Sequence, residues 1–285
     1  MLIHRKYTHI IDFKRKKSII TIKSSGGRTM LLTIDAGNTN TTIGFYDGKE
    51  LVCTARLSTD TRRTAEQYAA ELSAVATLKK ASLDGVTGAI ISSVVPEMTA
   101  TLKKAVSIVC GVNAKVLGPG LKNGLNIKID NPAQLGADLV AGAVAAISSY
   151  ELPCLVMDLG TATKISVIDA DGVYRGCTIS AGVAISLDAL ANSAAQLPTV
   201  NLDVDVCPAY GTNTVTSMQA GIILGTAAML DGLCERIEEN LGQPIKTVVS
   251  TGGFSREITK HCRRRHTYDP DLILRGLRII YEKNA

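Results

Sequence analysis

The sequence predicts an α/β fold built from two similar halves with a ligand cleft between them. Residues 31–48 read LLTIDAGNTNTTIGFYDG and residues 154–172 read CLVMDLGTATKISVIDADG. Both contain a short apolar run, an Asp-x-Gly sequence, a turn rich in small hydroxyl side chains and a second β-branched run, which is the pattern of a strand, a tight turn and a returning strand. Helical and strand patterns alternate after each hairpin, and this alternation is typical of α/β folds.

The first half, residues 30–150, continues with two helices and a strand. Thr64 to Lys80 is predicted to be an amphipathic helix, because Tyr68, Leu72, Val75 and Leu78 fall on one face. Gly88 to Val95 is predicted to be a buried strand. A further helix is expected to start at Asn131, with this residue as its N-cap and Pro132 as its first residue.

The second half, residues 151–285, follows the same plan. Asn213 to Leu241 is predicted to be a helix and Thr247 to Ser250 a strand, which leads into a third glycine-rich turn, Thr251-Gly252-Gly253. The two halves are expected to face each other across a cleft, with the boundary near residue 150.

Composition excludes several classes of protein. The 285 residues are 46% hydrophobic and 20% charged, which is typical of a globular chain and excludes a disordered one. No run of 18 apolar residues occurs, so no membrane-spanning helix is predicted. Aromatic residues make up 4% and Trp is absent, so a stacking surface for single-stranded nucleic acid is not expected.

The net charge of +5 comes from one end of the chain. Residues 1–29 hold eight Lys or Arg residues against Asp12, which leaves the remainder slightly acidic. Because Met30 stands directly before the first strand, residues 1–29 are predicted to be a dispensable basic extension. The alternative is that the run Lys14 to Lys17 binds nucleic acid or an anionic membrane surface. A secretory signal is disfavoured, because Ser18 to Ile22 is too short an apolar core.

Cysteine and histidine usage indicates reduced thiols in a cytoplasmic protein. The seven Cys residues are scattered and never form a Cys-x-x-Cys pair, which disfavours a disulfide framework or a zinc site. His261 and His266 lie in the sequence HCRRRH, which is interpreted as a solvated basic patch.

The glycine turns favour nucleotide binding over purely structural hairpins. A small turn after a buried strand can present N–H groups and hydroxyls to a phosphate. Asp35 and Asp158, at the strand ends, can hold a cation that offsets phosphate charge. Gly252 and Gly253 let the backbone come close to a base or ribose. Neither a GxxxxGK[ST] nor a GxGxxG sequence is present.

Asp138 is the strongest single candidate for catalysis. It is the only charged residue between Asn131 and Tyr150, in a segment apolar enough to be buried, and no cation lies at helical spacing from it. A buried carboxylate without a partner is suited to accept a proton from an alcohol. The alternative is a structural carboxylate bonded to backbone or to a distant Lys or Arg.

From Leu31 to the C-terminus the chain resembles the type III pantothenate kinases, members of the acetate kinase, sugar kinase, Hsp70 and actin superfamily. The resemblance rests on DAGNTNTTIG (35–44), LSTDTRRTAEQY (57–68), DNPAQLGAD (130–138), DLGTAT (158–163), STGGF (250–254) and DPDLILRGLRIIYEKN (269–284). It implies a duplicated actin-like (ribonuclease H-like) ATPase fold. It also implies ATP-dependent phosphorylation of pantothenate, the first step of coenzyme A biosynthesis, by a cytoplasmic homodimer whose site lies at the subunit interface.

The resemblance also implies roles for individual residues. The ATP-binding residues would be Asp35, Ala36, Gly37, Asn38, Thr39, Asn40, Thr41, Thr42 and Thr161, to which Gly252 and Gly253 are added from the turn pattern. Asp35 would help to place Mg²⁺, Asp138 would accept the proton, and Asp158 would bind a monovalent cation, K⁺ or NH₄⁺. The substrate-binding residues would be Ile129, Gly136, Ala137, Asp138, Leu139 and, from across the dimer interface, Thr214.

Three positions depart from the family pattern. Leu139 replaces an Arg, Ile129 a Tyr, and Lys164 a Thr. The Arg would bind the pantothenate carboxylate, and its loss is expected to cost about 2–4 kcal/mol of binding free energy unless another cation compensates. Lys164 is a candidate for that cation, or it contacts a phosphate or points to solvent. The alternatives to a pantothenate kinase are a kinase for another small alcohol and a non-catalytic regulatory relative.

Overall fold

The computed structural model describes residues 29–285 except 194–196 and 205, so the predicted extension of residues 1–29 lies outside the described residues but for Thr29. A first, five-stranded sheet has the order β3-β2-β1-β4-β5. β1–β2–β3 is an antiparallel meander, and β4 and β5 add on parallel. The strands are β1 (Met30–Ala36), β2 (Asn40–Asp47), β3 (Glu50–Ser58), β4 (Val86–Ser93) and β5 (Lys115–Val116).

The second sheet repeats this plan. Its order is β11-β10-β7-β8-β9-β6, in which β7–β8–β9 is the antiparallel meander and β10 and β11 are the parallel additions. β6 pairs with β9 at the other edge. The predicted duplication is therefore confirmed strand by strand. The strands are β6 (Asn126–Ile127), β7 (Cys154–Leu159), β8 (Ala162–Ile168), β9 (Val173–Ala181), β10 (Thr247–Thr251) and β11 (Thr267–Tyr268).

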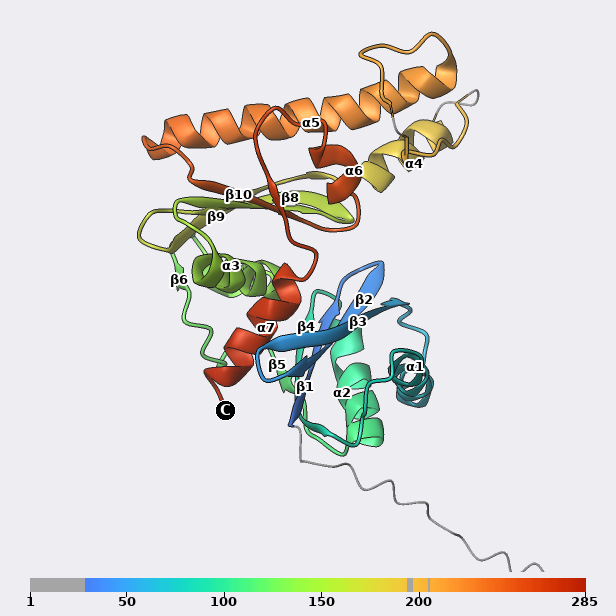
Figure 1. Cartoon of the computed structure of the whole chain (residues 1–285), viewed down its shortest axis with the longest axis vertical. Helices are drawn as coiled ribbons and strands as arrows, with labels where there is room; N and C mark the ends of the chain where they lie inside the picture. Colours follow the sequence, from blue (N-terminus) through green and yellow to red (C-terminus); the bar gives the residue numbers. More distant parts are fainter. Residues whose placement is uncertain (1–28, 194–196, 205) are drawn as a thin grey trace, which may run out of the picture.

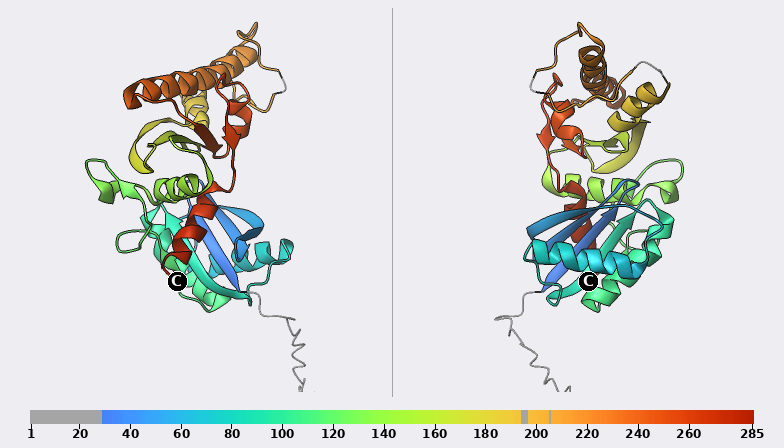
Figure 2. Two further views of the ribbon diagram at one scale, coloured as in Figure 1. Left: turned by 60° about the vertical axis from the view of Figure 1, so that its left-hand side comes forward. Right: turned by 90° about the vertical axis from the view of Figure 1, so that its right-hand side faces the viewer.

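Helices separate and cover the two sheets, as Figures 1 and 2 show. α1 (Ala65–Leu78) and α2 (Pro96–Cys110) cover the outer face of the first sheet. The outer face of the second sheet is covered by the long α5 (Thr214–Leu241) with α4 (Val183–Ser193) and α6 (Ser255–Thr259). α3 (Ala137–Ser149) and α7 (Leu272–Glu282) lie between the two sheets.

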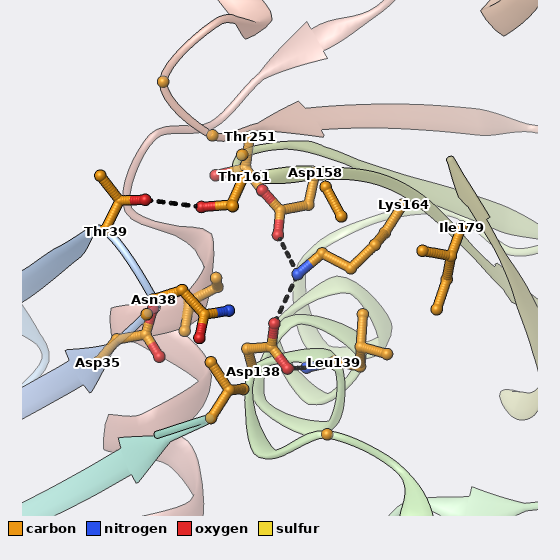
Figure 3. A pocket seen from close by; sticks show the side chains of 18 of the residues that line it. Asp35, Asn38, Thr39, Asp138, Leu139, Asp158, Thr161, Lys164, Ile179 and Thr251 are labelled. Carbon is orange, nitrogen blue, oxygen red and sulfur yellow. Dashed lines mark hydrogen bonds and ion pairs between the residues drawn. The ribbon is translucent and has the colours of Figure 1, made fainter. Parts of the chain in front are cut away.

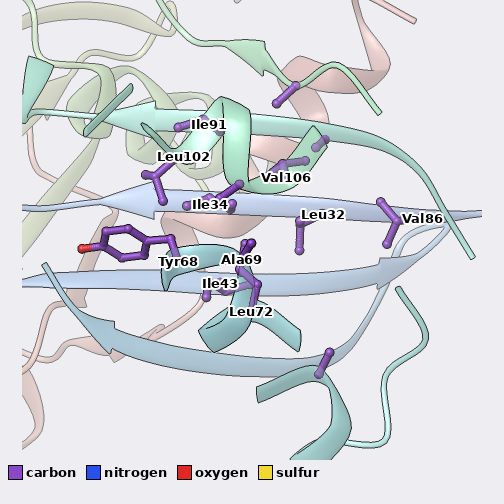
Figure 4. Packing of buried hydrophobic residues seen from close by; sticks show 14 of the residues in the cluster. Leu32, Ile34, Ile43, Tyr68, Ala69, Leu72, Val86, Ile91, Leu102 and Val106 are labelled. Atoms are coloured by element: carbon purple, nitrogen blue, oxygen red, sulfur yellow. The ribbon is translucent and has the colours of Figure 1, made fainter. Parts of the chain in front are cut away.

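The core of the first half shows why its helix forms where the sequence predicts. Ile34 and Ile43 of the sheet pack against Tyr68 and Leu72 of α1, all fully buried (Figure 4). Thr64 caps α1 in a capping box with the third residue of the helix, which fixes the predicted start. The prediction was wrong for Leu78, the last residue of the helix, because its side chain is 79% exposed.

The C-terminal helix α7 returns to the first half of the chain. Its Leu277 and Ile280 pack with Ile90 of β4 and Val140 of α3. The close approach of α7 to α3 requires a glycine, because a Cβ on Gly276 would lie 1.9 Å from the carbonyl oxygen of Ala141. α7 therefore joins the two sheets through the layer between them.

The helix predicted from Asn131 begins later than expected. Asn131 does cap a turn, since its side chain accepts a hydrogen bond from the Ala133 N–H at 3.2 Å, but this turn is a separate 3₁₀ helix (Pro132–Gln134). Leu135 is extended, with ψ of 123°, which interrupts the helical path, and α3 starts at Ala137. The N-cap signal was therefore real but belonged to a shorter element.

The long helix of the second half agrees with the sequence. Asn213 caps α5 and forms a capping box with Thr216. By length and composition, α5 is the one helix among the described residues that could cross a membrane. Here one face of it packs into the core of the second half through Met218, Ile223 and Leu230.

Candidate active site

A cavity of about 1070 Å³ lies between the halves and is lined by residues from both. Most of the residues that the sequence predicted for the site line this cavity. They are Asp35, Gly37, Asn38, Thr39, Asn40, Thr42, Ile129, Gly136, Asp138, Leu139, Asp158, Thr161, Gly252 and Gly253. Residues far apart in the chain therefore meet in one place.

The two Asp-x-Gly turns face each other directly across this cavity. The hydroxyl oxygens of Thr39 and Thr161 lie 3.0 Å apart and share a hydrogen bond (Figure 3). Each turn is closed by a glycine N–H, but the first turn is one residue longer: the Gly37 N–H donates to the Asn40 carbonyl at 3.0 Å, and the Gly160 N–H donates to the Ala162 carbonyl at 3.2 Å. Two similar turns thus form the opposing walls expected of a phosphate-binding cleft.

Asp35 ends β1 and is half-buried in the cleft. It lies opposite Thr42 in the hairpin, and among the described residues no cation forms an ion pair with it. Burial, followed by the nearby Asp138 and Asp158 carboxylates, raises the pKa of Asp35 to about 7. A carboxylate held in this environment is a suitable oxygen ligand for a divalent cation.

Asp158 occupies the same place in the second hairpin but has a different neighbour. It lies opposite Lys164, whose Nζ is 2.8 Å from Asp158 Oδ2 and 2.6 Å from Asp138 Oδ2 (Figure 3). The three side chains are only 13–17% exposed. The ammonium of Lys164 therefore bridges two carboxylates and does not point to solvent.

This bridge corrects the prediction that Asp138 is an unpaired base. Its partner Lys164 lies on β8, where helical spacing around Asp138 could not reveal it, so the carboxylate has the distant Lys partner that the alternative named, while its role as proton acceptor stays a prediction. Burial lowers the pKa of Lys164, but Asp158 and Asp138 outweigh burial and hold the pKa above its ordinary value. Burial raises the pKa of Asp158, and the Lys164 ammonium opposes that shift.

Asp138 is held in a fixed orientation from two sides. It lies in the first turn of α3, where a negative side chain is favoured by the exposed N–H groups of the helix. The Leu139 N–H donates to Asp138 Oδ1 at 2.9 Å, and Lys164 donates to Oδ2. A carboxylate has about four lone-pair positions, so both oxygens retain capacity to accept a proton from a substrate.

Four of the predicted site residues do not line the cavity. Ala36 and Thr41 are fully buried, and the Thr41 hydroxyl bonds with that of Thr59, which in turn donates to the Gly37 carbonyl. Ala137 begins α3, and Thr214 is exposed at the start of α5. Thr41 thus supports the first turn from behind, a role that alternation along β2 could have indicated.

Several residues that line the cavity were not predicted from the sequence. Arg56 of β3 lies opposite Thr42, lines the cavity and forms no ion pair among the described residues. Ile179 and Ile185 also line it and are largely exposed. Pairing the third strand of the meander onto the second would have brought Arg56 to the cleft.

The third glycine turn serves two purposes. Gly252 has φ of +94°, and a Cβ there would lie 2.6–2.7 Å from the backbone of Leu159 and from Asp158 Oδ1. The close approach that requires glycine at this position is therefore to the second hairpin. Gly253 has open space beside it and lines the cavity, so it is the glycine available to a ligand.

The duplicated sheet order and the two facing Asp-x-Gly turns define the actin-like ATPase fold, the class predicted from the sequence. The fold is similar to the solved structure of the Lmo2764 protein from Listeria monocytogenes, with a TM-score of 0.50 and 12% identity over 90% of this chain and 99% of that chain. At this level of identity the likeness concerns the fold alone.

Sequence comparison defines the family within this class. The sequence model of the type III pantothenate kinases matches residues 31–236. A type III pantothenate kinase of Rubrobacter xylanophilus is 38% identical over 260 residues, which cover 90% of this chain and 98% of the relative. One of Exiguobacterium is 40% identical over 255 residues, covering 90% and 99%. The chain belongs to the type III pantothenate kinase family.

Proposed function

We propose that this protein transfers a phosphoryl group from ATP to pantothenate to give 4'-phosphopantothenate, the first step of coenzyme A biosynthesis, in the cytoplasm. The observation that carries the proposal is the convergence of Asp35, Asp138 and Asp158 on one cavity between two phosphate-type turns. Membership of the family supports the choice of pantothenate as the alcohol.

The first hairpin is suited to hold the nucleotide and its metal. Asp35 offers a carboxylate without an ion pair among the described residues, and Mg²⁺ prefers such oxygen ligands. The Thr39 and Thr161 hydroxyls, from opposite turns, are placed to contact phosphate oxygens. When bound, Mg²⁺ would offset the charge that develops on the transferred phosphoryl group.

Asp138 supplies the acid–base chemistry in this proposal. The primary alcohol of pantothenate gives its proton to the Asp138 carboxylate as its oxygen bonds to the γ-phosphorus. The bond between that phosphorus and the β–γ bridging oxygen breaks, and ADP leaves. The hydrogen bond from Leu139 N–H and the contact with Lys164 keep the carboxylate aimed during this step.

The substrate end of the pocket is less polar than the family pattern implies. Ile129 and Leu139 line the cavity where a Tyr and an Arg would stand, and Lys164 is already engaged by two carboxylates. Lys164 is therefore not free to replace the missing Arg. Arg56 is the other cation that lines the cavity, and it is the group in the described part of the chain best placed to offset substrate charge.

We also propose that the protein is a homodimer whose second copy completes the site. Ile179 is 66% exposed, Ile185 46% and Val215 42%, which leaves apolar surface at the cavity and at the start of α5. Burying such surface stabilises an interface. In this arrangement Thr214 of the partner subunit would reach the substrate, as the family resemblance implies.

The resemblance further implies a monovalent cation at Asp158. The residues present do not fit one, because the Lys164 ammonium occupies the position between the two carboxylates, 2.8 Å from Asp158 Oδ2 and 2.6 Å from Asp138 Oδ2.

The direct test is to incubate the purified protein with MgATP and pantothenate and to identify phosphopantothenate by mass spectrometry. Formation of this product supports the proposal. Turnover only with an alcohol lacking a carboxylate would favour the alternative kinase, and nucleotide binding without turnover on any alcohol would favour the regulatory alternative.

Leu139→Arg, alone and with Ile129→Tyr, should lower the KM for pantothenate with little change in kcat, because the contact is remote from the reacting oxygen.

A further inference from the structure

We propose that the side-chain ammonium of Lys164 takes the place of the exchangeable monovalent cation in this protein, so that its activity does not require K⁺ or NH₄⁺. This inference rests on the proposed function, because it concerns the same site. Lys164 is a positioning residue here: it touches the two carboxylates Asp138 and Asp158, and it acts on the reaction through them.

The contacts of Lys164 are those of a bound cation. Its Nζ is within 2.6–2.8 Å of one oxygen from each of two carboxylates on different elements, α3 and β8's neighbour β7. An ammonium carries one positive charge and three N–H donors, as NH₄⁺ carries one charge and four. The side chain therefore delivers to this point the charge and the hydrogen bonds that a free ammonium ion would bring.

A second cation at the same oxygens would be opposed. Two positive charges about 4 Å apart repel far more strongly in a partly buried protein site than in bulk water. A tethered ammonium, in contrast, is present at every salt concentration. Lys164 thus neutralises the two carboxylates and also prevents a free monovalent cation from binding to the same oxygens.

The fold explains how one residue achieves this. Lys164 is the direct cross-strand neighbour of Asp158, just as Thr42 is of Asp35. Side chains opposite each other on an antiparallel pair are close enough to interact. A lysine at this register position consequently reaches the carboxylate of its own hairpin, and its length lets it reach Asp138 on α3 as well.

The test compares the wild type with Lys164→Thr in choline, Na⁺, K⁺ and NH₄⁺ chlorides at equal ionic strength. The wild type should give the same rate and the same thermal midpoint in all four salts. Lys164→Thr should lose about tenfold or more in rate in choline and Na⁺, and recover in K⁺ or NH₄⁺. Its midpoint should rise by about 2–4 °C in K⁺ or NH₄⁺ only, because a bound ion stabilises the folded state.

Lys246→Thr is the matched control, since it makes the same chemical change at an exposed position of the same half. It should behave as the wild type does. Stimulation of the wild type by K⁺, or a Lys164→Thr protein whose rate and midpoint ignore K⁺ and NH₄⁺, would overturn the proposal. If Lys164→Thr does not fold, the same comparison of rates and midpoints is made with Lys164→Gln. The wild-type salt series by itself also tests whether activity requires K⁺ or NH₄⁺. A wild type with no pantothenate turnover would refute the proposed function, while the thermal midpoints would still decide this inference.

A different observation carries a second inference, which concerns a cluster of side chains beside α5 in the second half. We infer that Asp231, Cys262 and His266 form a binding site for a transition-metal ion of the Zn²⁺ type. One ligand atom of each lies within 4.8 Å of the others. Both ring nitrogens of His266 are buried and have no hydrogen-bond partner within the described part of the chain, which is costly for an imidazole.

This finding corrects the interpretation of HCRRRH as a solvated patch at His266, whose ring nitrogens are buried, whereas Arg263 and Arg265 are exposed as that interpretation expects. Thiolate, imidazole and carboxylate are the ligands of Zn²⁺, at about 2.0–2.3 Å, and a contraction of about 1 Å would bring the three atoms to those distances. Metal binding would release the thiol proton to solvent and leave the metal bonded to Sγ.

The test is titration of the chelator-treated full chain with Co²⁺, followed by competition with Zn²⁺. One Co²⁺ per chain with a thiolate-to-cobalt absorption band, displaced by Zn²⁺, is expected. Cys262→Ser should abolish the band and His266→Gln should weaken Co²⁺ binding by about tenfold or more, whereas Cys110→Ser should change neither. Absence of the band in the wild type, or an unchanged band in Cys262→Ser, would overturn the inference.

Discussion

The two hairpin turns of this protein have a similar backbone, although the second is one residue shorter, and they differ in charge. Each has an Asp at the end of a central strand, a glycine N–H that closes the turn, and a threonine that meets its counterpart across the cleft. Across the hairpin from Asp35 lies Thr42, and across from Asp158 lies Lys164. The residue opposite each Asp therefore sets the charge of its turn. Thr42 leaves the Asp35 carboxylate without a paired cation, whereas Lys164 places a cation beside Asp158.

This difference shows how a duplicated fold comes to bind an asymmetric ligand. The first turn retains a carboxylate free to meet a divalent cation and polyphosphate. In the second turn the Asp158 carboxylate forms an ion pair with Lys164, and Lys164 also holds Asp138 at the place where the alcohol reacts. The backbone forms two similar walls of the cleft, and the side chain opposite each Asp gives the two walls different charges and therefore different roles.

The largest effect is expected from Asp138→Asn, which removes the carboxylate that Lys164 holds for the substrate. The rate should fall by about 10²–10⁴-fold, the usual loss when a general base is removed. MgATP affinity, measured by calorimetry, should be nearly unchanged, because Asp35 and both turns are intact. Asp84→Asn, at an exposed position, is the control. A variant that retains more than about a tenth of the wild-type rate would reassign Asp138 to a structural role.

The supports behind the two turns also differ, and glycine substitutions should reveal this. The first turn rests on the Thr59 hydroxyl, while the second lies against Gly252. Gly252→Ala should lower the free energy of unfolding by about 2–4 kcal/mol, because the added Cβ collides with backbone at a positive φ. Gly253→Ala, where a Cβ meets open space, should cost less than about 1 kcal/mol. Equal urea midpoints for the two variants would contradict this account.

Thr42→Lys would build the pairing of the second turn into the first. The new ammonium should pair with Asp35 and compete with the metal, so MgATP affinity should fall by about 10–100-fold. Thr42→Val, which removes the hydroxyl without adding charge, should weaken binding far less. Titration calorimetry measures both, and similar losses for the two variants would mean that the hydroxyl matters more than the charge.

The smallest effect concerns stability and pH. Because the pKa of Asp35 is raised to about 7, the folded chain keeps a proton there that the unfolded chain loses near pH 4. This residue's contribution to stability is thus present at low pH and is lost as pH rises to about 7. A shift of this size would correspond to about 4 kcal/mol for a fully buried group, and less here because Asp35 is only half-buried and solvent screens its charge. In chelator without nucleotide, Asp35→Asn should therefore exceed the wild type in unfolding free energy by about 1–2 kcal/mol at pH 8, and match it near pH 4. An equal difference in unfolding free energy between Asp35→Asn and the wild type at both pH values would contradict a raised pKa at Asp35.

Much of the fold could be predicted from the sequence because its determinants are local. The repeated Asp-x-Gly hairpins gave the duplication, and Thr64 and Asn213 marked helix starts through caps that involve neighbouring residues. The start of α3 was misplaced, since a real N-cap at Asn131 is followed by an extended Leu135. The sequence showed no signal strong enough to separate the short turn from the helix.

The sequence predicted which aspartates belong to the candidate site, but not which residues form ion pairs within it. Asp35, Asp138 and Asp158 were each identified from local patterns, and the structure brings them to one cavity. The Lys164 bridge depends on the distance between β8 and α3, which only the tertiary fold sets. Arg56 was missed for the same reason, because it reaches the cleft through strand pairing.

The position of α7 has a consequence for biosynthesis. It is translated after the other described elements, yet its Leu277 and Ile280 complete the packing over the inner face of the first sheet. The sheet that is translated first therefore keeps that face exposed until α7 has left the ribosome. A ribosome-bound chain that stops before Leu272 should have a first half open to protease, and a chain long enough to expose all of α7 should be protected there.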